Sequence, residues 1–92
     1  MIEVKYTRHF EKIYKKLHSN QQVMVDEAIE KIAKNPKIGK VKKGDLSGFH
    51  VYKFSMFSQL TLIGYYYDDG EMIILIVSIG SHENFYRDIK RN

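Results

Sequence analysis

The chain has 92 residues, enough for one domain with a single modest core. It has no cysteine, which excludes disulfides, thiolate metal sites and cysteine nucleophiles. Lys and Arg number 15 against 11 Asp and Glu, and this excess either favours a polyanionic or acidic partner or simply keeps the chain soluble. The longest apolar run is far shorter than the ~20 residues of a membrane span, and no signal peptide is visible. We therefore expect one cytoplasmic domain, residues 1–92, with no membrane contact.

The first third of the sequence predicts a strand followed by two helices. Residues 2–6 alternate apolar and polar side chains, the pattern of a half-buried strand. Thr7 can cap a first amphipathic helix. A second helix follows, with Ser19 and Gln22 at capping-box spacing, and it ends at Asn35-Pro36 because proline disfavours a helical conformation in its predecessor. Two helices joined by so short a turn predict an antiparallel hairpin lying on a sheet.

The second half of the sequence predicts a meander of three strands. Residues 37–45 are polar and strongly basic, which is typical of a loop with room for a short bridge or edge strand. Asp68-Asp69-Gly70 predicts a tight hairpin turn, because glycine tolerates positive φ. The strands are rich in aromatic and β-branched residues and are expected at Phe49–Ser55, Leu60–Tyr67 and Glu71–Ile79.

The end of the sequence predicts one more helix. Gly80 breaks the last strand, and Ser81 can cap a helix over His82–Arg91 with Phe85 and Ile89 facing inward. The predicted fold class is therefore α+β. It comprises an N-terminal strand, an antiparallel helical hairpin, a three-stranded antiparallel meander completing one sheet, and a short C-terminal helix.

A basic stretch is the first candidate for chemistry. It runs from Lys37 through Lys42 and Lys43 and continues with His50 and Lys53 in the following strand. Lysine ammonium groups neutralise phosphates without reading base sequence, although a solvated loop is an equal alternative. Lys53 is the residue of most interest, because it lies within a strand among Phe49, Val51, Tyr52 and Phe54, where a cation normally needs a purpose or an exposed face.

The start of the last predicted helix is the second candidate. His82 lies in its first turn, where free backbone N–H groups attract a phosphate and where an imidazole can exchange a proton near neutral pH. Tyr86 shares that helix face and can stack on a base. The alternative is that His82 is only a polar helix-start residue and Tyr86 a packing or surface ring. The four histidines lack the spacing of a zinc site, so we expect no metal and no other cofactor.

The order of elements resembles the RelE/ParE toxin superfamily over nearly the whole chain. Asn35-Pro36 followed by residues 43–54 is similar to that family's passage from the second helix through a basic loop into the first meander strand. Gly80-Ser81-His82 with an aromatic residue at Tyr86 resembles the ending of YafQ-like members. The resemblance implies the toxin of a bacterial toxin–antitoxin system, inhibited by a cognate antitoxin protein.

The resemblance also implies an activity. Members similar to RelE and YafQ cleave messenger RNA on the ribosome, so the chain is expected to be a metal-independent endoribonuclease that arrests translation, an mRNA interferase. The implied catalytic residues are His82, Tyr86 and Lys53, with a lysine or His50 as the general base. The implied RNA-binding residues are Lys42, Lys43, His50, Arg87, Lys90 and Arg91.

One departure from the family pattern keeps other functions open. RNA-cleaving relatives commonly carry an arginine in the second meander strand, where this chain has Leu60-Thr61-Leu62. A bidentate guanidinium contact to phosphate would then have to come from Arg87 or Arg91, or be replaced by lysines. The alternatives are a non-enzymatic inhibitor of DNA gyrase, similar to ParE, and a plain nucleic-acid-binding module.

Overall fold

The computed structural model describes residues 2–41, 48–82 and 84–85, and these form the expected α+β arrangement of one sheet and a helical hairpin. The sheet has five strands in the order β1-β5-β4-β3-β2. β1 pairs in parallel with β5, and the other neighbours are antiparallel. The strands span Glu3–Tyr6 (β1), Lys40–Val41 (β2), Phe49–Met56 (β3), Gln59–Asp68 (β4) and Ile73–Ser81 (β5).

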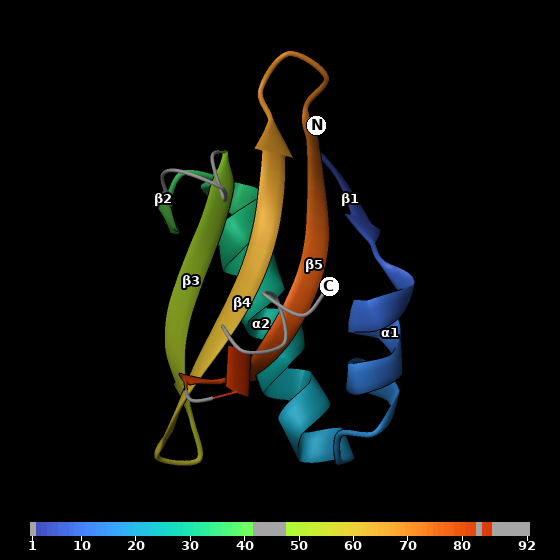
Figure 1. Cartoon of the computed structure of the whole chain (residues 1–92), viewed down its shortest axis with the longest axis vertical. Helices are drawn as coiled ribbons and strands as arrows, with labels where there is room; N and C mark the ends of the chain where they lie inside the picture. Colours follow the sequence, from blue (N-terminus) through green and yellow to red (C-terminus); the bar gives the residue numbers. More distant parts are fainter. Residues whose placement is uncertain (1, 42–47, 83, 86–92) are drawn as a thin grey trace.

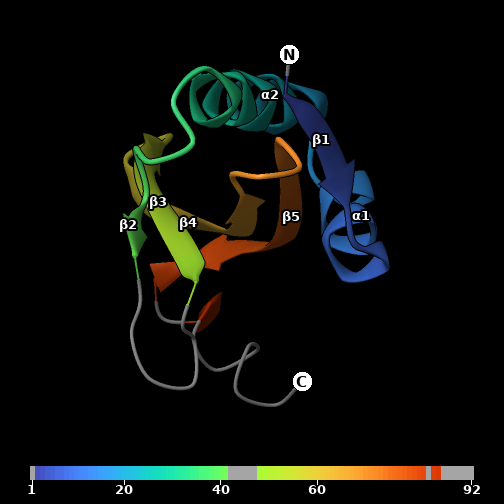
Figure 2. The same ribbon diagram turned by 90° about the horizontal axis from the view of Figure 1, so that it is seen from above.

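Two helices, α1 (Arg8–Lys15) and α2 (Ser19–Lys34), cover one face of this sheet (Figures 1 and 2). We call it the helix face. The opposite face, here called the distal face, carries the side chains of Phe49, Val51, Lys53, Leu62 and Tyr66. The assignment follows from the register, because directly opposed residues of antiparallel strands point to the same side of the sheet.

The start of α1 is fastened to the sheet by one side chain. Thr7 Oγ1 accepts a hydrogen bond from the Phe10 backbone N–H (3.1 Å) and donates one to the Val77 carbonyl oxygen (2.8 Å). The predicted cap at Thr7 is therefore confirmed. The hydroxyl also joins the beginning of the chain to β5, across 70 residues of sequence.

The start of α2 lies one residue earlier than the sequence predicts. The N-cap is His18, whose backbone is extended (φ −66°, ψ 155°). Its N–H donates to Gln21 Oε1 at 2.9 Å. The prediction of Ser19 paired with Gln22 was wrong, because the same spacing of a polar cap and a glutamine occurs in two adjacent registers and Ser19 is already helical.

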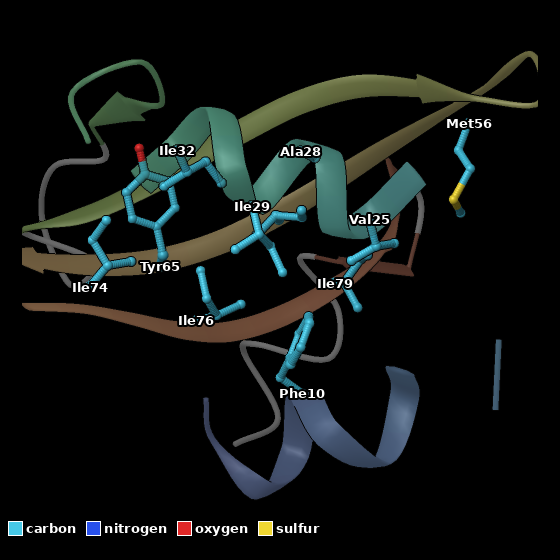
Figure 3. Packing of buried hydrophobic residues seen from close by; sticks show 11 residues of the cluster. Phe10, Val25, Ala28, Ile29, Ile32, Met56, Tyr65, Ile74, Ile76 and Ile79 are labelled. Atoms are coloured by element: carbon cyan, nitrogen blue, oxygen red, sulfur yellow. The ribbon is translucent and has the colours of Figure 1, made fainter. Parts of the chain in front are cut away.

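The main core fills the space between the helices and the helix face (Figure 3). Phe10 of α1 and one side of α2 pack on alternate residues of β4 and β5. A smaller cluster lies on the distal face. The α2 residues of the main core are Val25, Ala28, Ile29 and Ile32, and the smaller cluster consists of Phe49, Val51, Leu62 and Phe85.

The two hairpin turns place unusual backbone angles on residues other than glycine. Phe57 (φ 52°) and Ser58 (φ 66°) connect β3 to β4. Between β4 and β5, Asp68 Oδ1 accepts a hydrogen bond from the Glu71 N–H (3.1 Å), and Met72 carries the positive φ of 58°. The prediction that Gly70 would supply the left-handed residue was therefore wrong, and β5 begins at Ile73 instead of Glu71.

The predicted last helix falls mostly on residues 83 and 86–91, outside the described residues, so it stays a prediction. Within the described part of the chain, neither helix has the length and apolar character needed to cross a membrane.

Candidate functional site

Lys53 and the end of β5 lie on the same face of the sheet. Lys53 is directly opposite Leu62 on β4, and Leu62 is directly opposite Gly80 on β5. These three residues form one row across the distal face. Two strand spacings separate the Cα atoms of Lys53 and Gly80 by about 10 Å. Lys53 is exposed, so its four-carbon side chain is free to reach across this row.

Phe85 holds the segment after β5 against the distal face. Its ring is 1% exposed and stacks on Phe49, with 6.4 Å between the ring centroids and 24° between the planes. The backbone of Phe85 also approaches Gly80, where an added Cβ would lie 3.7 Å from the Phe85 Cα. His82 lies between these anchor points and is exposed. The residues that flank His82, Gly80 and Phe85, therefore border the same surface as Lys53.

A second lysine of the distal face comes from the basic stretch. Lys40 in the short strand β2 is directly opposite Val51, a distal-face residue, so its side chain points to that face. The Cα atoms of Lys40 and Lys53 are about 8 Å apart by strand geometry. The sequence shows that Lys40 belongs to a basic stretch, but its direction depends on a strand pairing that the sequence does not reveal.

Tyr66 is a distal-face aromatic residue that is not among the predicted site residues. Tyr65 is buried on the helix face, and Tyr66 next to it points the other way and is 41% exposed. Its ring meets Phe49 edge to face, at 5.1 Å and 61°. Alternation along a strand was the signal that could have separated the two tyrosines.

His50 does not belong to the distal-face group. It is 8% exposed, lies directly opposite Tyr65 and stacks on that ring on the helix face (5.1 Å, 20°). Its Nδ1 is buried and has no hydrogen-bond partner among the residues that the structure describes. The expectation of His50 as an RNA contact or general base is therefore corrected: a separation of three residues along one strand turns His50 and Lys53 to opposite faces.

Tyr65 anchors the segment that leads into β2. Its hydroxyl donates to the Pro36 carbonyl oxygen (2.6 Å) and accepts from the Gly39 N–H (3.0 Å). Burial raises the pKa of this hydroxyl above 10.0, while the hydrogen bond from Gly39 acts in the opposite direction. A core tyrosine thus fixes the residue immediately before Lys40.

Several predicted site residues cannot be placed. They lie outside the described residues and their roles stay predictions: Lys42, Lys43, Tyr86, Arg87, Lys90 and Arg91. Among the residues that the structure does describe, the cations of the distal face are lysines. In the stretch Leu60-Thr61-Leu62, which lacks the family's arginine, Leu62 is fully buried. The same residues contain no group of His, Asp or Glu arranged to hold a metal ion.

Lysine ammonium groups and a restrained phenol ring thus share one surface of a sheet that is covered by helices on its other side, and the exposed His82 follows the strand end that borders this surface. Such a surface can neutralise phosphate, exchange protons and stack on a base. The same fold occurs in solved structures of bacterial toxins. The toxin–antitoxin complex RelBE2 of Mycobacterium tuberculosis matches with a TM-score of 0.76 and 19% identity, covering 88% of this chain and 98% of that chain.

Two further solved structures of toxins share this fold. The Escherichia coli RelBE toxin–antitoxin complex matches with a TM-score of 0.71 and 16% identity over 88% of this chain and 96% of that chain. The YoeB/ParE toxin from Agrobacterium tumefaciens matches with a TM-score of 0.68 and 14% identity over 88% and 99%. At these identities the matches establish a shared fold.

The sequence itself establishes the family. Residues 4–90 match the family of ParE-like toxins of type II bacterial toxin–antitoxin systems. The match spans nearly the whole chain, and the chain belongs to this family. No functionally curated protein matches it significantly. The predicted superfamily is confirmed, and the closer likeness to YafQ stays a prediction.

Proposed function

We propose that this toxin is a metal-independent endoribonuclease that cleaves messenger RNA on the ribosome in the cytoplasm. The observation that carries the proposal is the row from Lys53 through Leu62 to Gly80, two residues before His82. A phosphate lying over this row would be within reach of an ammonium group and an imidazole at once. Had the register turned Lys53 to the helix face, no single phosphate could contact both.

The proposed reaction is an internal transfer at phosphorus. The 2′-hydroxyl loses its proton to a base and attacks the adjacent phosphorus, forming the 2′-O–P bond. The P–O5′ bond then breaks, and His82 supplies the proton that the leaving 5′-oxygen needs. The products are a 2′,3′-cyclic phosphate and a 5′-hydroxyl.

The cations have a separate task in this reaction. Lys53 and Lys40 would stabilise the negative charge that accumulates on the phosphorane oxygens. Because His50 lies on the helix face, we assign the role of general base for the 2′-hydroxyl to a lysine. Tyr86, Lys42, Lys43 and the basic residues of the predicted last helix keep their proposed roles as a stacking ring and as RNA contacts.

We propose in addition that a cognate antitoxin protein neutralises the toxin. The support is family membership and the fact that similar toxins have been solved as complexes. These include RelBE of Escherichia coli and a mutant of the Escherichia coli toxin RelE with a peptide of its antitoxin.

His82→Ala tests the nuclease proposal. Loss of a general acid costs about 100-fold or more in rate, so the variant should lose growth arrest on induction and cleavage of mRNA on translating ribosomes. Its affinity for the antitoxin should persist, which reports an intact fold. His18→Ala is the matched control, because His18 is also exposed at a helix start but lies away from the distal face. Cleavage by His82→Ala at the wild-type rate would disprove the mechanism.

Inhibition of DNA gyrase is the second candidate. It is favoured by the lysine-only character of the described distal face, which offers no planar guanidinium to a phosphate. Purified toxin tested in parallel on translating ribosomes and on gyrase supercoiling separates the two functions. Under the nuclease proposal, ribosome-bound mRNA is cut and supercoiling is unaffected.

A further inference from the structure

We infer that Tyr66 is a nucleobase-stacking residue, and that Lys40 and Lys53 contact the phosphates of the same single strand. This inference rests on the proposed function and adds a substrate-binding site to it. The ligand class is single-stranded RNA, with a base on the tyrosine ring and the sugar–phosphate backbone passing over β3.

The position of Tyr66 is unusual for a packing residue. On either side along β4, Tyr65 and Tyr67 point to the helix face, where Tyr65 is buried. On the distal face, the apolar residue Leu62 is fully buried, whereas Tyr66 keeps 41% of its surface exposed. A tyrosine ring that is 41% exposed has area to offer to a ligand.

The ring of Tyr66 is also held in place. Phe49 contacts it edge to face at 5.1 Å, and Phe49 in turn stacks on the buried Phe85. A restrained ring loses little side-chain entropy when a base stacks on it. Stacking suits every base, because each has a π face.

The two lysines lie along the path that a single-stranded RNA would follow if one of its bases stacked on Tyr66. Tyr66 is directly opposite Phe49 at the start of β3, Lys40 is opposite Val51, and Lys53 follows two residues later on the same face. By strand geometry, Tyr66 and Lys53 are about 14 Å apart with Lys40 beside the path between them. An aromatic ring beside cationic groups is the combination that binds single-stranded nucleic acids.

The binding test uses a fluorescein-labelled 2′-O-methyl oligoribonucleotide of roughly ten nucleotides, which cannot be cleaved because its 2′-oxygens are blocked. Fluorescence anisotropy gives the affinity for each variant. Tyr66→Leu should weaken binding roughly 5- to 100-fold, whereas Tyr66→Phe, which keeps the ring, should bind within about twofold of the wild type. Tyr6→Leu is the matched control, since Tyr6 is 46% exposed on β1 and is remote from the proposed strand path.

Salt dependence separates the lysines from the tyrosine. Replacing Lys40 or Lys53 with alanine should reduce the slope of log affinity against log salt by about 0.7 each, because one fewer counterion is released. Tyr66→Leu should leave that slope unchanged. Lys34→Ala is the lysine control, as Lys34 pairs with Glu30 on α2 at 3.2 Å.

A crosslink on the unaltered protein guards against a misfolded variant. Irradiation of the wild-type complex with a 5-iodouridine-substituted oligonucleotide should attach the base to Tyr66. Wild-type affinity in Tyr66→Leu, or a crosslink at another residue only, would overturn the inference and leave the nuclease proposal intact if the His82 variant is inactive on ribosomes. A wild-type protein that does not bind the oligonucleotide overturns the inference as well, while the ribosome assay decides the proposed function independently.

Discussion

Replacing Gly64 with alanine tests whether the segment after β5 is seated on the distal face. An added Cβ at this position would overlap Phe49 Cζ and lie 2.7 Å from Phe85 Cζ. Carbon atoms in contact are normally about 3.5–4.0 Å apart, so the Phe85 ring would have to move by about 1 Å. Overpacking a tight site costs about 1–3 kcal/mol, whereas glycine in a strand is itself unfavourable by roughly 0.5–1 kcal/mol. The free energy of unfolding should therefore fall by about 1–2 kcal/mol.

Thermal and urea denaturation followed by circular dichroism measure this loss. In a domain of this size, 1 kcal/mol corresponds to about 4–8 °C in Tm. Phe85→Leu removes the atom that the new methyl meets, so the cost of Gly64→Ala should shrink by at least about 0.5 kcal/mol in that background. An equal cost in both backgrounds would show that Phe85 does not pack over Gly64. A Gly64→Ala variant as stable as the wild type would refute the packing of both rings.

Two other substitutions test structural features away from the site. Tyr65→Phe removes the hydroxyl that binds the buried Gly39 N–H and the part-buried Pro36 carbonyl oxygen. Leaving these backbone groups without that partner should cost about 1–3 kcal/mol in denaturant unfolding. Burial raises the pKa of Tyr65, so the folded state favours its neutral form. The contribution of Tyr65 to the free energy of unfolding is therefore complete below pH 10.0 and is lost as the pH rises through the folded-state pKa. A phenylalanine variant that shows the same alkaline loss of stability would contradict this. Ser58→Gly should stabilise the protein by about 1 kcal/mol, since Ser58 holds φ at 66°, and an unchanged or lower denaturation midpoint would argue against that backbone angle.

The elements of this fold could be predicted from the sequence because their signals are local. Thr7 ahead of a helical apolar pattern indicated the first helix and its cap correctly. The cap of the second helix was misplaced by one residue, since His18 with Gln21 and Ser19 with Gln22 offer the same chemistry. The choice between them depends on backbone angles that spacing does not determine.

The sheet face on which each strand residue lies could have been predicted from the sequence, but the predictions did not use this alternation. Along one strand, His50 and Lys53 have opposite parity, which already separates a buried ring from an exposed cation. In the same way, Tyr65 and Tyr66 cannot share a role.

The pairing of segments that are distant in the sequence could not be predicted from the sequence. Lys40 faces the distal side only because β2 pairs with β3 in one particular register. The parallel pairing of β1 with β5 is likewise set by tertiary packing. Nothing in the composition of either segment specifies its neighbour.

The hydrogen bond from the Thr7 hydroxyl to the Val77 carbonyl oxygen has a consequence for folding during synthesis. Synthesis proceeds from the N-terminus, so β1 leaves the ribosome while its partner β5 has not yet been translated. The first strand stays unpaired while the roughly 70 residues up to β5 are made. Contacts of such long sequence separation slow folding. The distal face is therefore complete only after β5 has emerged, and β5 carries the residue that Thr7 binds 70 positions further along the sequence.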